Sequence, residues 1–331
     1  MSEQAKDMKG AKELVEMAQK IYAWQQAQGK SISQMVREFP SLGSDKTYGR
    51  LRDGQTDEYD IEAQLMNYRA ALALIEAMSD SGDYNKIQIY DDLTAVTEVI
   101  RSALECMKSS KTGTNARVVL IEGPSGIGKT KALEVLAGRY GMQVVMFETS
   151  DVWDDSPGAL LAEILRKISP EAVPISKVDR LDKCVQLLNK KTYCLAIDEA
   201  HHLGPRSLNT LKTLVNKTPG QFLLAAIPTL WTRLERSSYM EARQLTTNRL
   251  AERVQLHLSE RDTVKYLRHV FPDAQENDML AGAKLICAEA DTHGYMAFVR
   301  DVANIVRKMD GSASPTAKMF VKGIDIAIKR R

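Results

Sequence analysis

Residues 118–130 read VVLIEGPSGIGKT, in which an apolar run passes directly into a glycine-rich turn. Four consecutive apolar residues, 118–121, are typical of a strand that is buried on both faces of a parallel sheet. The turn fits the pattern G-x-x-x-x-G-K-[ST] at every fixed position, and residues 131–140 continue with helical periodicity. A strand, a glycine-rich turn and a helix in this order form the context in which the pattern binds phosphate groups.

The residue types of this turn suit the phosphate chain of a nucleotide. Glycines let successive backbone N–H groups approach phosphate oxygens, and the N-terminus of the following helix adds its positive dipole end. We expect Lys129 to reach the β- and γ-phosphates and the Thr130 hydroxyl to bind Mg²⁺. The predicted phosphate-binding residues are Gly123, Pro124, Ser125, Gly126, Ile127, Gly128, Lys129 and Thr130.

A second apolar run, residues 193–197, ends in two adjacent carboxylates, Asp198 and Glu199. We expect Asp198 to hold Mg²⁺, directly or through water, and Glu199 to orient and polarise the attacking water. Together with Lys129, these two carboxylates are the predicted catalytic groups for the hydrolysis of ATP. The predicted cofactors are ATP and Mg²⁺, with Thr130 and Asp198 as the metal ligands.

Two other patterns of nucleotide enzymes are present only in part. Residues 198–201, DEAH, spell a helicase motif, but 331 residues are too few for two helicase lobes and the remaining helicase elements. Residues 216–219 resemble a guanine-reading motif in which Pro219 replaces the required Asp. His201 and His202 follow the carboxylates. Because adjacent side chains are expected to diverge and no partner cluster is visible, we predict a structural or sensing role for them rather than a metal site.

The composition is that of an ordinary globular protein, with 44% hydrophobic residues, 27% charged residues and a formal net charge of +2. Any basic surface must therefore be local. The four cysteines form no C-x-x-C pair, which argues against a zinc or disulfide framework and suits a reducing cytosol. Residues 1–13 are polar, and no apolar run approaches the roughly 18 residues of a membrane span. We therefore predict a cytoplasmic protein without a membrane partner.

Residues 1–80 have helical periodicity and form the first predicted domain. Within it, residues 31–54 read as two short helices across a tight turn, which is the layout of a helix-turn-helix. The second helix would present side chains suited to DNA phosphates and base edges, and the acidic cluster at residues 57–60 would have to point away. The candidate DNA-binding residues are Lys46, Thr47, Tyr48, Arg50 and Arg52. The alternative is a helical interaction module whose charges form a solvated face.

Residues 81–92 are predicted to be a linker and residues 93–258 an α/β domain. Strands are expected at residues 118–121, 144–147, 192–197 and 222–226, alternating with helices. This alternation predicts a doubly wound parallel sheet with helices on both faces. Residues 259–331 have a helical pattern throughout and are predicted to form a small α-helical domain with the basic tail Lys329-Arg330-Arg331.

Several segments together resemble the AAA+ ATPases over roughly residues 90–310. They are GPSGIGKT at 123–130, CLAIDEAHHL at 194–203, AAIPTLWTRLERS at 225–237, TNRLAERVQLHLSERD at 247–262 and the helical C-terminal region. Within that class the chain is most similar to the transposition regulators MuB, TnsC, TniB and IstB, and the helix-turn-helix ahead of the ATPase makes the layout closest to MuB. The resemblance implies a P-loop AAA+ fold in which the C-terminal helices form the lid.

The resemblance also implies further site residues. The family places a polar sensor after the fourth strand, where Thr229 is the nearest polar residue. Its arginine finger, which reaches the γ-phosphate of a neighbouring protomer, matches Arg249 best, with Arg243 and Arg253 as alternates. A second sensor arginine in the lid corresponds to Arg300, which lies one turn beyond the usual position.

Proteins of this group form ATP-dependent rings or helical filaments around duplex DNA. The resemblance therefore implies a protein that assembles on DNA without sequence preference and recruits or activates a transposase at that target. ATP hydrolysis would then disassemble it. Two alternatives stay open. One is a helix-turn-helix regulator whose ATPase is a signalling switch at a specific DNA site, and the other is an ATPase similar to clamp loaders or helicase loaders.

Overall fold

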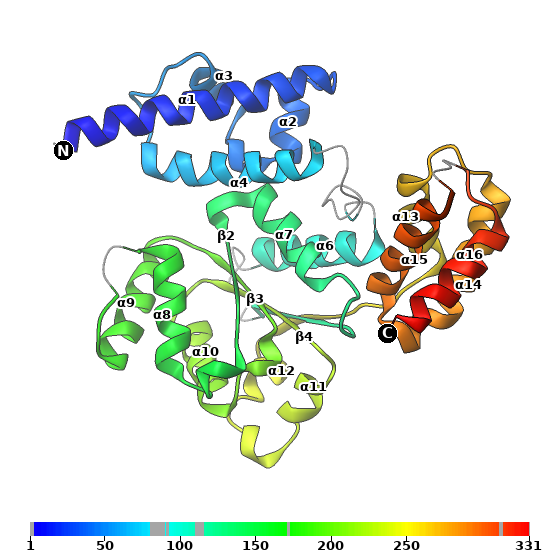
Figure 1. Cartoon of the computed structure of the whole chain (residues 1–331). Helices are drawn as coiled ribbons and strands as arrows, with labels where there is room; N and C mark the ends of the chain where they lie inside the picture. Colours follow the sequence, from blue (N-terminus) through cyan, green and yellow to red (C-terminus); the bar gives the residue numbers. More distant parts are fainter. Residues whose placement is uncertain are drawn as a thin grey trace.

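The computed structural model describes residues 3–79, 90, 93–109, 116–170, 173–310 and 314–330. Figure 1 shows an N-terminal group of helices in blue, a central α/β body and a C-terminal group of helices in orange and red. The expected linker, residues 81–92, lies outside the described residues apart from Tyr90, as does Arg331 of the expected basic tail. Among the described residues, no helix combines the length and the apolar character needed to cross a membrane.

The N-terminal group has four helices and a core of its own. The helices are α1 (Glu3–Ala27), α2 (Ile32–Glu38), α3 (Asp45–Arg52) and α4 (Ile61–Ser79), with a 3₁₀ turn at Pro40–Leu42 between α2 and α3. A capping box begins α2, because the Ser31 hydroxyl accepts from the Gln34 N–H and the Gln34 side chain accepts from the Ser31 N–H. Phe39, Tyr48 and Tyr68 are fully buried among these helices. The two short helices across a turn are therefore present as predicted.

The N-terminal group packs on the α/β body through α4 and α7 (Lys129–Tyr140). A Cβ atom at Gly138 of α7 would lie 2.8 Å from Leu74 Cδ2, and one at Gly141 would lie 2.5 Å from Asn67 Oδ1. Both distances are shorter than real Cβ contacts, so a glycine is needed at each position for the two groups to approach this closely.

The central sheet has five parallel strands in the order β2-β3-β4-β1-β5. The strands are β1 (Val118–Glu122), β2 (Val144–Glu148), β3 (Cys194–Asp198), β4 (Gln221–Ala226) and β5 (Leu250–Gln255). Four of them match the expected strands to within two residues at each end. The fifth, β5, was not predicted, because residues 250–255 carry charged side chains at an edge of the sheet and lack a continuous apolar run.

Helices cover both faces of the sheet, so the strands are apolar on both sides. Val119 and Ile121 of β1 belong to one core, and Val118 and Leu120 belong to the other, as expected when successive side chains alternate. The first face is covered by α6 (Thr94–Ser109) and α7, and the second by α8 (Pro157–Ile168), α9 (Lys177–Lys190) and α10 (Pro205–Lys217). Two short helices, α11 (Thr229–Leu234) and α12 (Gln244–Thr247), connect β4 to β5.

The C-terminal group consists of α13 (Glu260–Val270), α14 (Glu276–His293), α15 (Tyr295–Asp310) and α16 (Ala317–Lys329). Its buried side chains, such as Leu267 and Phe298, belong to the same continuous core as Val119 of β1. The C-terminal helices are therefore held against the α6 and α7 side of the body (Figure 1). This contact brings α15 close to the turn that follows β1, as described below.

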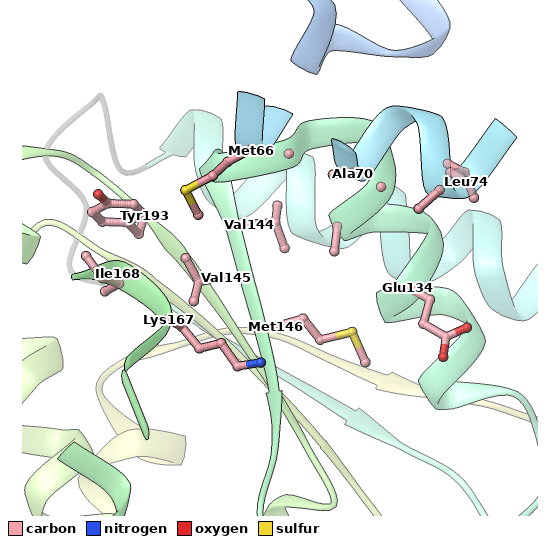
Figure 2. A pocket seen from close by; sticks show the side chains of 14 residues that line it. Met66, Ala70, Leu74, Glu134, Val144, Val145, Met146, Lys167, Ile168 and Tyr193 are labelled. Atoms are coloured by element: carbon pink, nitrogen blue, oxygen red, sulfur yellow. The ribbon is translucent and has the colours of Figure 1, made fainter. Parts of the chain in front are cut away.

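An apolar groove of about 400 Å³ runs along β2 (Figure 2). Val144, Val145 and Met146 all line it. Because successive strand residues point to opposite faces, a groove that touches three in a row must pass along the strand edge. The groove is walled by α4 and α7 on one side and by the end of α8 on the other.

Candidate nucleotide-binding site

The glycine-rich turn joins the carboxyl end of β1 to the N-terminus of α7. Gly126 has φ 82° and Gly128 has φ 109°, values in the left-handed region that side chains disfavour. Lys129 is 5% exposed, and its ammonium donates to the carbonyl oxygens of Gly123 at 2.9 Å and Pro124 at 3.0 Å. The motif is thus folded as a loop around its own lysine, whose ammonium is held by two of the loop's carbonyl groups.

Two oxygen ligands suited to Mg²⁺ meet beside this loop. The Thr130 hydroxyl at the start of α7 donates to Asp198 Oδ2 over 2.6 Å, and Asp198 ends β3. The other carboxylate oxygen of Asp198 accepts from the Glu199 N–H over 2.9 Å, so the buried side chain is fixed. A hydroxyl and a carboxylate are the hard oxygen donors that Mg²⁺ prefers, and these residues therefore fit the expected ion.

The charges at the site are mutually dependent. Burial lowers the pKa of the Lys129 ammonium, while the Glu199 and Asp198 carboxylates act in the opposite direction. Phosphate groups would add further negative charge beside the ammonium, so nucleotide binding favours its protonated form.

Glu199 is held by its backbone in an unusual conformation. It has φ 51°, in the left-handed region, although it is not a glycine. The Thr149 hydroxyl, just beyond β2, donates to the Glu199 carbonyl over 2.7 Å, and the Thr149 N–H donates to the Asp198 carbonyl over 3.0 Å. Sequence analysis missed Thr149. A polar residue directly after an expected strand was its one signal.

A cavity of about 170 Å³ lies beside the phosphate loop, and α15 of the C-terminal group contributes residues to it. The Ala297 N–H of α15 donates to the Gly126 carbonyl over 3.1 Å, and a Cβ atom at Gly126 would lie 2.6 Å from the Gly294 carbonyl oxygen. Arg300, one turn further along α15, lines the cavity together with Lys129 and Glu199. Tyr90 and Met296 also line it and were not predicted. The structure thus brings the predicted Arg300 to the phosphate loop.

Other predicted site residues lie elsewhere. Thr229 begins α11 beyond β4, is exposed and does not line this cavity. Arg249 precedes β5, whose first residue pairs with Val118 at the start of β1. The strand β1 runs roughly 13 Å from Val118 to the start of the phosphate loop. Arg249 therefore lies at the amino ends of the strands, and the site of its own protomer lies at their carboxyl ends. Its Nε donates to Asn216 Oδ1 over 2.8 Å.

The alternate arginines differ in their surroundings. Arg253 of β5 is paired with the buried Glu122 carboxylate, and its guanidinium lies 3.9 Å from the centroid of the Trp231 ring. It is therefore engaged within its own protomer. Arg243 is exposed between the 3₁₀ turn Ser237–Tyr239 and α12.

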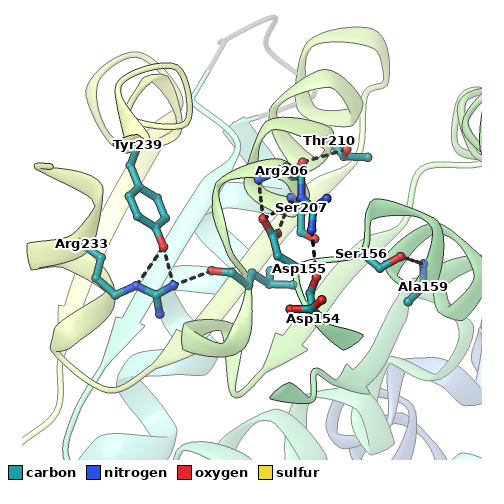
Figure 3. A network of polar contacts seen from close by, with 10 residues as sticks. Asp154, Asp155, Ser156, Ala159, Arg206, Ser207, Thr210, Arg233 and Tyr239 are labelled. Carbon is teal, nitrogen blue, oxygen red and sulfur yellow. Dashed lines mark hydrogen bonds and ion pairs between the residues drawn. The ribbon is translucent and has the colours of Figure 1, made fainter. Parts of the chain in front are cut away.

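A polar network supports the segments around Asp198 and Glu199, the predicted catalytic carboxylates (Figure 3). Asp155, in the loop after β2, accepts from the backbone N–H groups of Arg206 at 2.9 Å and Ser207 at 2.8 Å and so caps α10. On the other side, Arg233 of α11 donates to the carbonyls of His201 and Leu203. The turn after Glu199 is thereby tied to α11, and α10 is tied to the loop after β2.

The prediction for α3 needs correction at Tyr48, which is fully buried in the N-terminal core and cannot present its ring to DNA. Burial also raises the pKa of its hydroxyl.

The other candidate residues of α3 lie at the surface in different surroundings. Lys46 is exposed, and Thr47 shares a hydrogen bond with the Ser44 hydroxyl. Glu58 of the acidic cluster does not point away from α3 as expected, because it forms an ion pair with Arg50. Arg52 is paired with Asp53 over 2.7 Å.

The expectation that the adjacent histidine side chains diverge is wrong. The His201 and His202 ring centroids lie 4.3 Å apart, and His201 Nδ1 is 3.2 Å from Glu199 Oε2. The two rings meet although successive residues of the 3₁₀ turn Ala200–His202 leave the backbone about 120° apart. Burial is the main cause that lowers the pKa of His201.

The match to one family model agrees with this geometry. Residues 112–234 match the family model of the AAA domain. The Thermotoga maritima RuvB Holliday junction branch migration motor has a similar structure, with 16% identity, a TM-score of 0.42 and coverage of 70% of this chain and 68% of that chain. Aeropyrum pernix ORC1 in complex with DNA has 15% identity, a TM-score of 0.49 and coverage of 72% of this chain and 66% of that chain. C. elegans PCH-2 has 15% identity, a TM-score of 0.44 and coverage of 71% of this chain and 68% of that chain. No curated protein matches the chain.

The chain therefore contains an AAA domain, and its five-stranded parallel sheet with a phosphate loop after β1 has the P-loop AAA+ fold. The protein is an ATPase whose cofactors are ATP and Mg²⁺. These statements confirm the fold class, the enzymatic activity and the cofactors predicted from the sequence. The resemblance is confirmed as far as the AAA+ ATPases, and the transposition-regulator group remains a prediction.

Proposed function

We propose that this ATPase assembles on duplex DNA in its ATP-bound state, without sequence preference, and recruits or activates a transposase at that target. Hydrolysis of ATP then disassembles it. The observation that carries the assembly step is the position of Arg249 at the amino ends of the strands, whereas the phosphate loop lies at their carboxyl ends. The transposase step is supported by the sequence resemblance to MuB, TnsC, TniB and IstB. The four described cysteines are all free thiols, which supports a cytoplasmic setting.

Within a protomer, we assign Lys129 to the β- and γ-phosphates and the Thr130–Asp198 pair to Mg²⁺. Glu199 orients the attacking water, and Arg300 contacts the nucleotide from the lid. When ATP is bound, the Lys129 ammonium exchanges its two carbonyl acceptors for phosphate oxygens, which are the stronger acceptors because they are charged. Mg²⁺ supplies neutralisation of the charge on the phosphates.

Between protomers, Arg249 serves the site of a neighbour. A guanidinium suits this task because it is always charged and its planar fork neutralises the charge that develops on the transferred phosphoryl group. Its bond to Asn216 is partly exposed and can be exchanged for the neighbour's phosphate. A site completed by the next protomer makes hydrolysis depend on assembly into a ring or filament.

Contact with DNA by α3 requires a similar exchange. Arg50 and Arg52 hold ion pairs at the surface, where water and salt screen such pairs and leave them weak. A DNA phosphate can therefore replace Glu58 or Asp53 at little cost, and Lys46 is already exposed. Binding of this kind rests on phosphate contacts, so it should weaken steeply with salt and vary little with sequence.

The proposal is tested by negative-stain microscopy of the protein on random-sequence duplex DNA, with ATP, with a slowly hydrolysed analogue and without nucleotide. We expect filaments or stacked rings only with nucleotide, and persistent ones with the analogue. Discrete particles at one sequence would instead support a helix-turn-helix switch. Absence of DNA-bound assemblies, together with co-purification of a clamp or helicase, would support a loader. Either result would overturn the proposal.

A further inference from the structure

We propose that Glu199, His201 and His202 form a binding site for a divalent transition-metal ion such as Zn²⁺, separate from the Mg²⁺ ligands. One ligand atom from each of the three side chains lies within 4.8 Å of the other two. All three side chains are partly buried, so the site is formed within the fold and is open to solvent on one side. This proposal concerns regulation of the proposed catalytic site.

The local backbone explains why three neighbouring residues converge. The His202 N–H donates to the Glu199 carbonyl over 2.9 Å, which closes one 3₁₀ turn. Glu199 precedes this turn with φ 51°, and from that position its carboxylate lies within 4.8 Å of a ligand nitrogen of His202. His201 joins them through its ring contact with His202 and its 3.2 Å approach to Glu199.

The turn is also held from outside, which keeps the cluster in place. Arg233 of α11 donates to the carbonyls of His201 and Leu203, and Thr149 donates to the carbonyl of Glu199. Hydrogen bonds to the carbonyls of Glu199, His201 and Leu203 hold the backbone that carries the three side chains. A preformed ligand set of this kind binds a metal ion with less loss of conformational entropy.

The donor types select the metal. Two imidazole nitrogens and one carboxylate oxygen form a set that Zn²⁺ accepts in tetrahedral geometry, with water as the fourth ligand. Mg²⁺ prefers oxygen donors and octahedral geometry, so it remains with Thr130 and Asp198. The Asp198 carboxylate acts on His201 in the opposite direction to the nearby positive charges of Lys129 and Arg233.

The expected consequence is inhibition. A Glu199 carboxylate bound to Zn²⁺ cannot orient the attacking water, so the ion would hold the protein in its ATP-bound state. This consequence rests on the role proposed for Glu199. The binding of the metal ion itself does not rest on that role, and the two are measured separately.

Binding is measured by titrating the nucleotide-free full chain with Co²⁺ and recording its visible absorption. We expect one ion per chain with tetrahedral absorption, and in His202→Ala an affinity about 10- to 100-fold weaker. His269→Ala, which removes a histidine exposed on α13, is the matched control and should bind like the wild type. No saturable Co²⁺ binding, or equal binding by wild type and His202→Ala, would overturn the proposal.

Regulation is measured as ATP turnover at fixed Mg²⁺ and rising Zn²⁺, with each variant compared with its own rate in the absence of Zn²⁺. We expect Zn²⁺ to inhibit the wild type and His269→Ala, and His202→Ala to need about tenfold more Zn²⁺ for the same inhibition. A nitrogen-donor chelator that leaves Mg²⁺ in place should restore turnover. Co²⁺ binding without inhibition by Zn²⁺ would disprove the regulatory role. DNA assembly by a protein that binds no Co²⁺ would disprove the metal site and leave the proposed function intact.

Discussion

At the residue scale, the carboxylate to which we assign water activation is positioned by an unusual backbone conformation. Glu199 adopts φ 51°, and Thr149 accounts for that conformation by bonding the carbonyl of the same residue. A left-handed non-glycine residue costs of order 1 to 3 kcal/mol and persists only where surrounding contacts over-determine it. The strained residue is here the one to which we assign water activation.

Glu199→Gln should separate nucleotide binding from hydrolysis. The amide keeps the size and the backbone contacts of the carboxylate but cannot accept a proton from water, so turnover should fall by about 10² to 10⁴. Binding of a fluorescent ATP analogue should remain near the wild-type affinity. Lys129→Ala is the comparison variant and should lose the binding itself. Wild-type turnover by Glu199→Gln would show that another group activates the water.

Asp155→Asn should reveal a pH-dependent contribution to stability. Burial acts to raise the pKa of Asp155, but the hydrogen bonds from Ser207 and Arg206 together lower it below its ordinary value. A lowered folded-state pKa stabilises the protein above the unfolded pKa, and this contribution is lost as pH falls through the folded value. At pH 7 we expect the variant to be less stable by about 1 to 2 kcal/mol in urea unfolding.

The difference between Asp155→Asn and the wild type should shrink as pH falls below about 4, because the wild-type carboxylate then becomes protonated too. Asp154→Asn is the matched control. Asp154 also has a positive φ, and its side chain caps no helix among the described residues. A difference that stays constant down to pH 3.5 or so would mean that the charge of Asp155 does not stabilise α10.

At the element scale, the close contact of α4 with α7 joins the N-terminal helices to the ATPase body. Gly138 faces Leu74 and Gly141 faces Asn67, so α4 lies on the helix that begins at Lys129. A displacement of α4 would therefore be transmitted to the helix that carries the phosphate-binding lysine. This contact gives a physical route between the proposed DNA-binding region and the nucleotide site.

Gly138→Ala should destabilise the protein, although alanine is the better helix former. The added Cβ would lie 2.8 Å from Leu74 Cδ2 and 3.0 Å from Leu74 Cβ, so α4 must shift, at a cost of about 1 to 3 kcal/mol. Gly49→Ala makes the same change in α3, where a Cβ atom meets nothing within 4 Å. It should stabilise by about 0.5 to 1 kcal/mol. Thermal unfolding of both variants measures the contrast, and equal shifts would rule out tight packing at Gly138.

At the scale of the whole molecule, two necessary parts of the proposed site lie at opposite ends of the parallel strands. The phosphate loop follows the carboxyl end of β1, and Arg249 precedes the amino end of the neighbouring β5. Since the two strands are parallel and lie side by side, the carboxyl end of β1 and the amino end of β5 cannot meet within one protomer. The arrangement favours an enzyme whose hydrolysis depends on the next copy.

Mixing two inactive variants should therefore restore activity. Arg249→Ala retains the phosphate loop but offers no arginine to its neighbour, and Glu199→Gln binds nucleotide and offers Arg249 but does not activate the water. Each alone should hydrolyse ATP poorly, and a mixture on DNA should exceed the sum of the separate rates. A mixture of Lys129→Ala with Glu199→Gln is the control and should gain nothing. A purely additive first mixture would exclude Arg249 as a residue that acts in the next protomer.

The sequence by itself determined the phosphate loop, the paired carboxylates and the four apolar strands. Each of these is specified by a local pattern, because the glycines at positions 126 and 128 and the apolar runs dictate their own backbone. Parallel order then places the carboxyl ends of β1 and β3 at one edge of the sheet, where Thr130 meets Asp198. For this reason the centre of the site was predictable.

Only the tertiary structure decided which side chains reach that centre and which are withdrawn from the surface. Tyr48 is buried because α3 packs its ring inside the N-terminal core, and Arg50 meets Glu58 because the chain turns back after α3. The lid, from more than 150 residues beyond the loop, brings Arg300 to Lys129, while Thr229 stays outside the cavity. Such contacts depend on how elements distant in sequence pack against one another, and no local pattern encodes that packing.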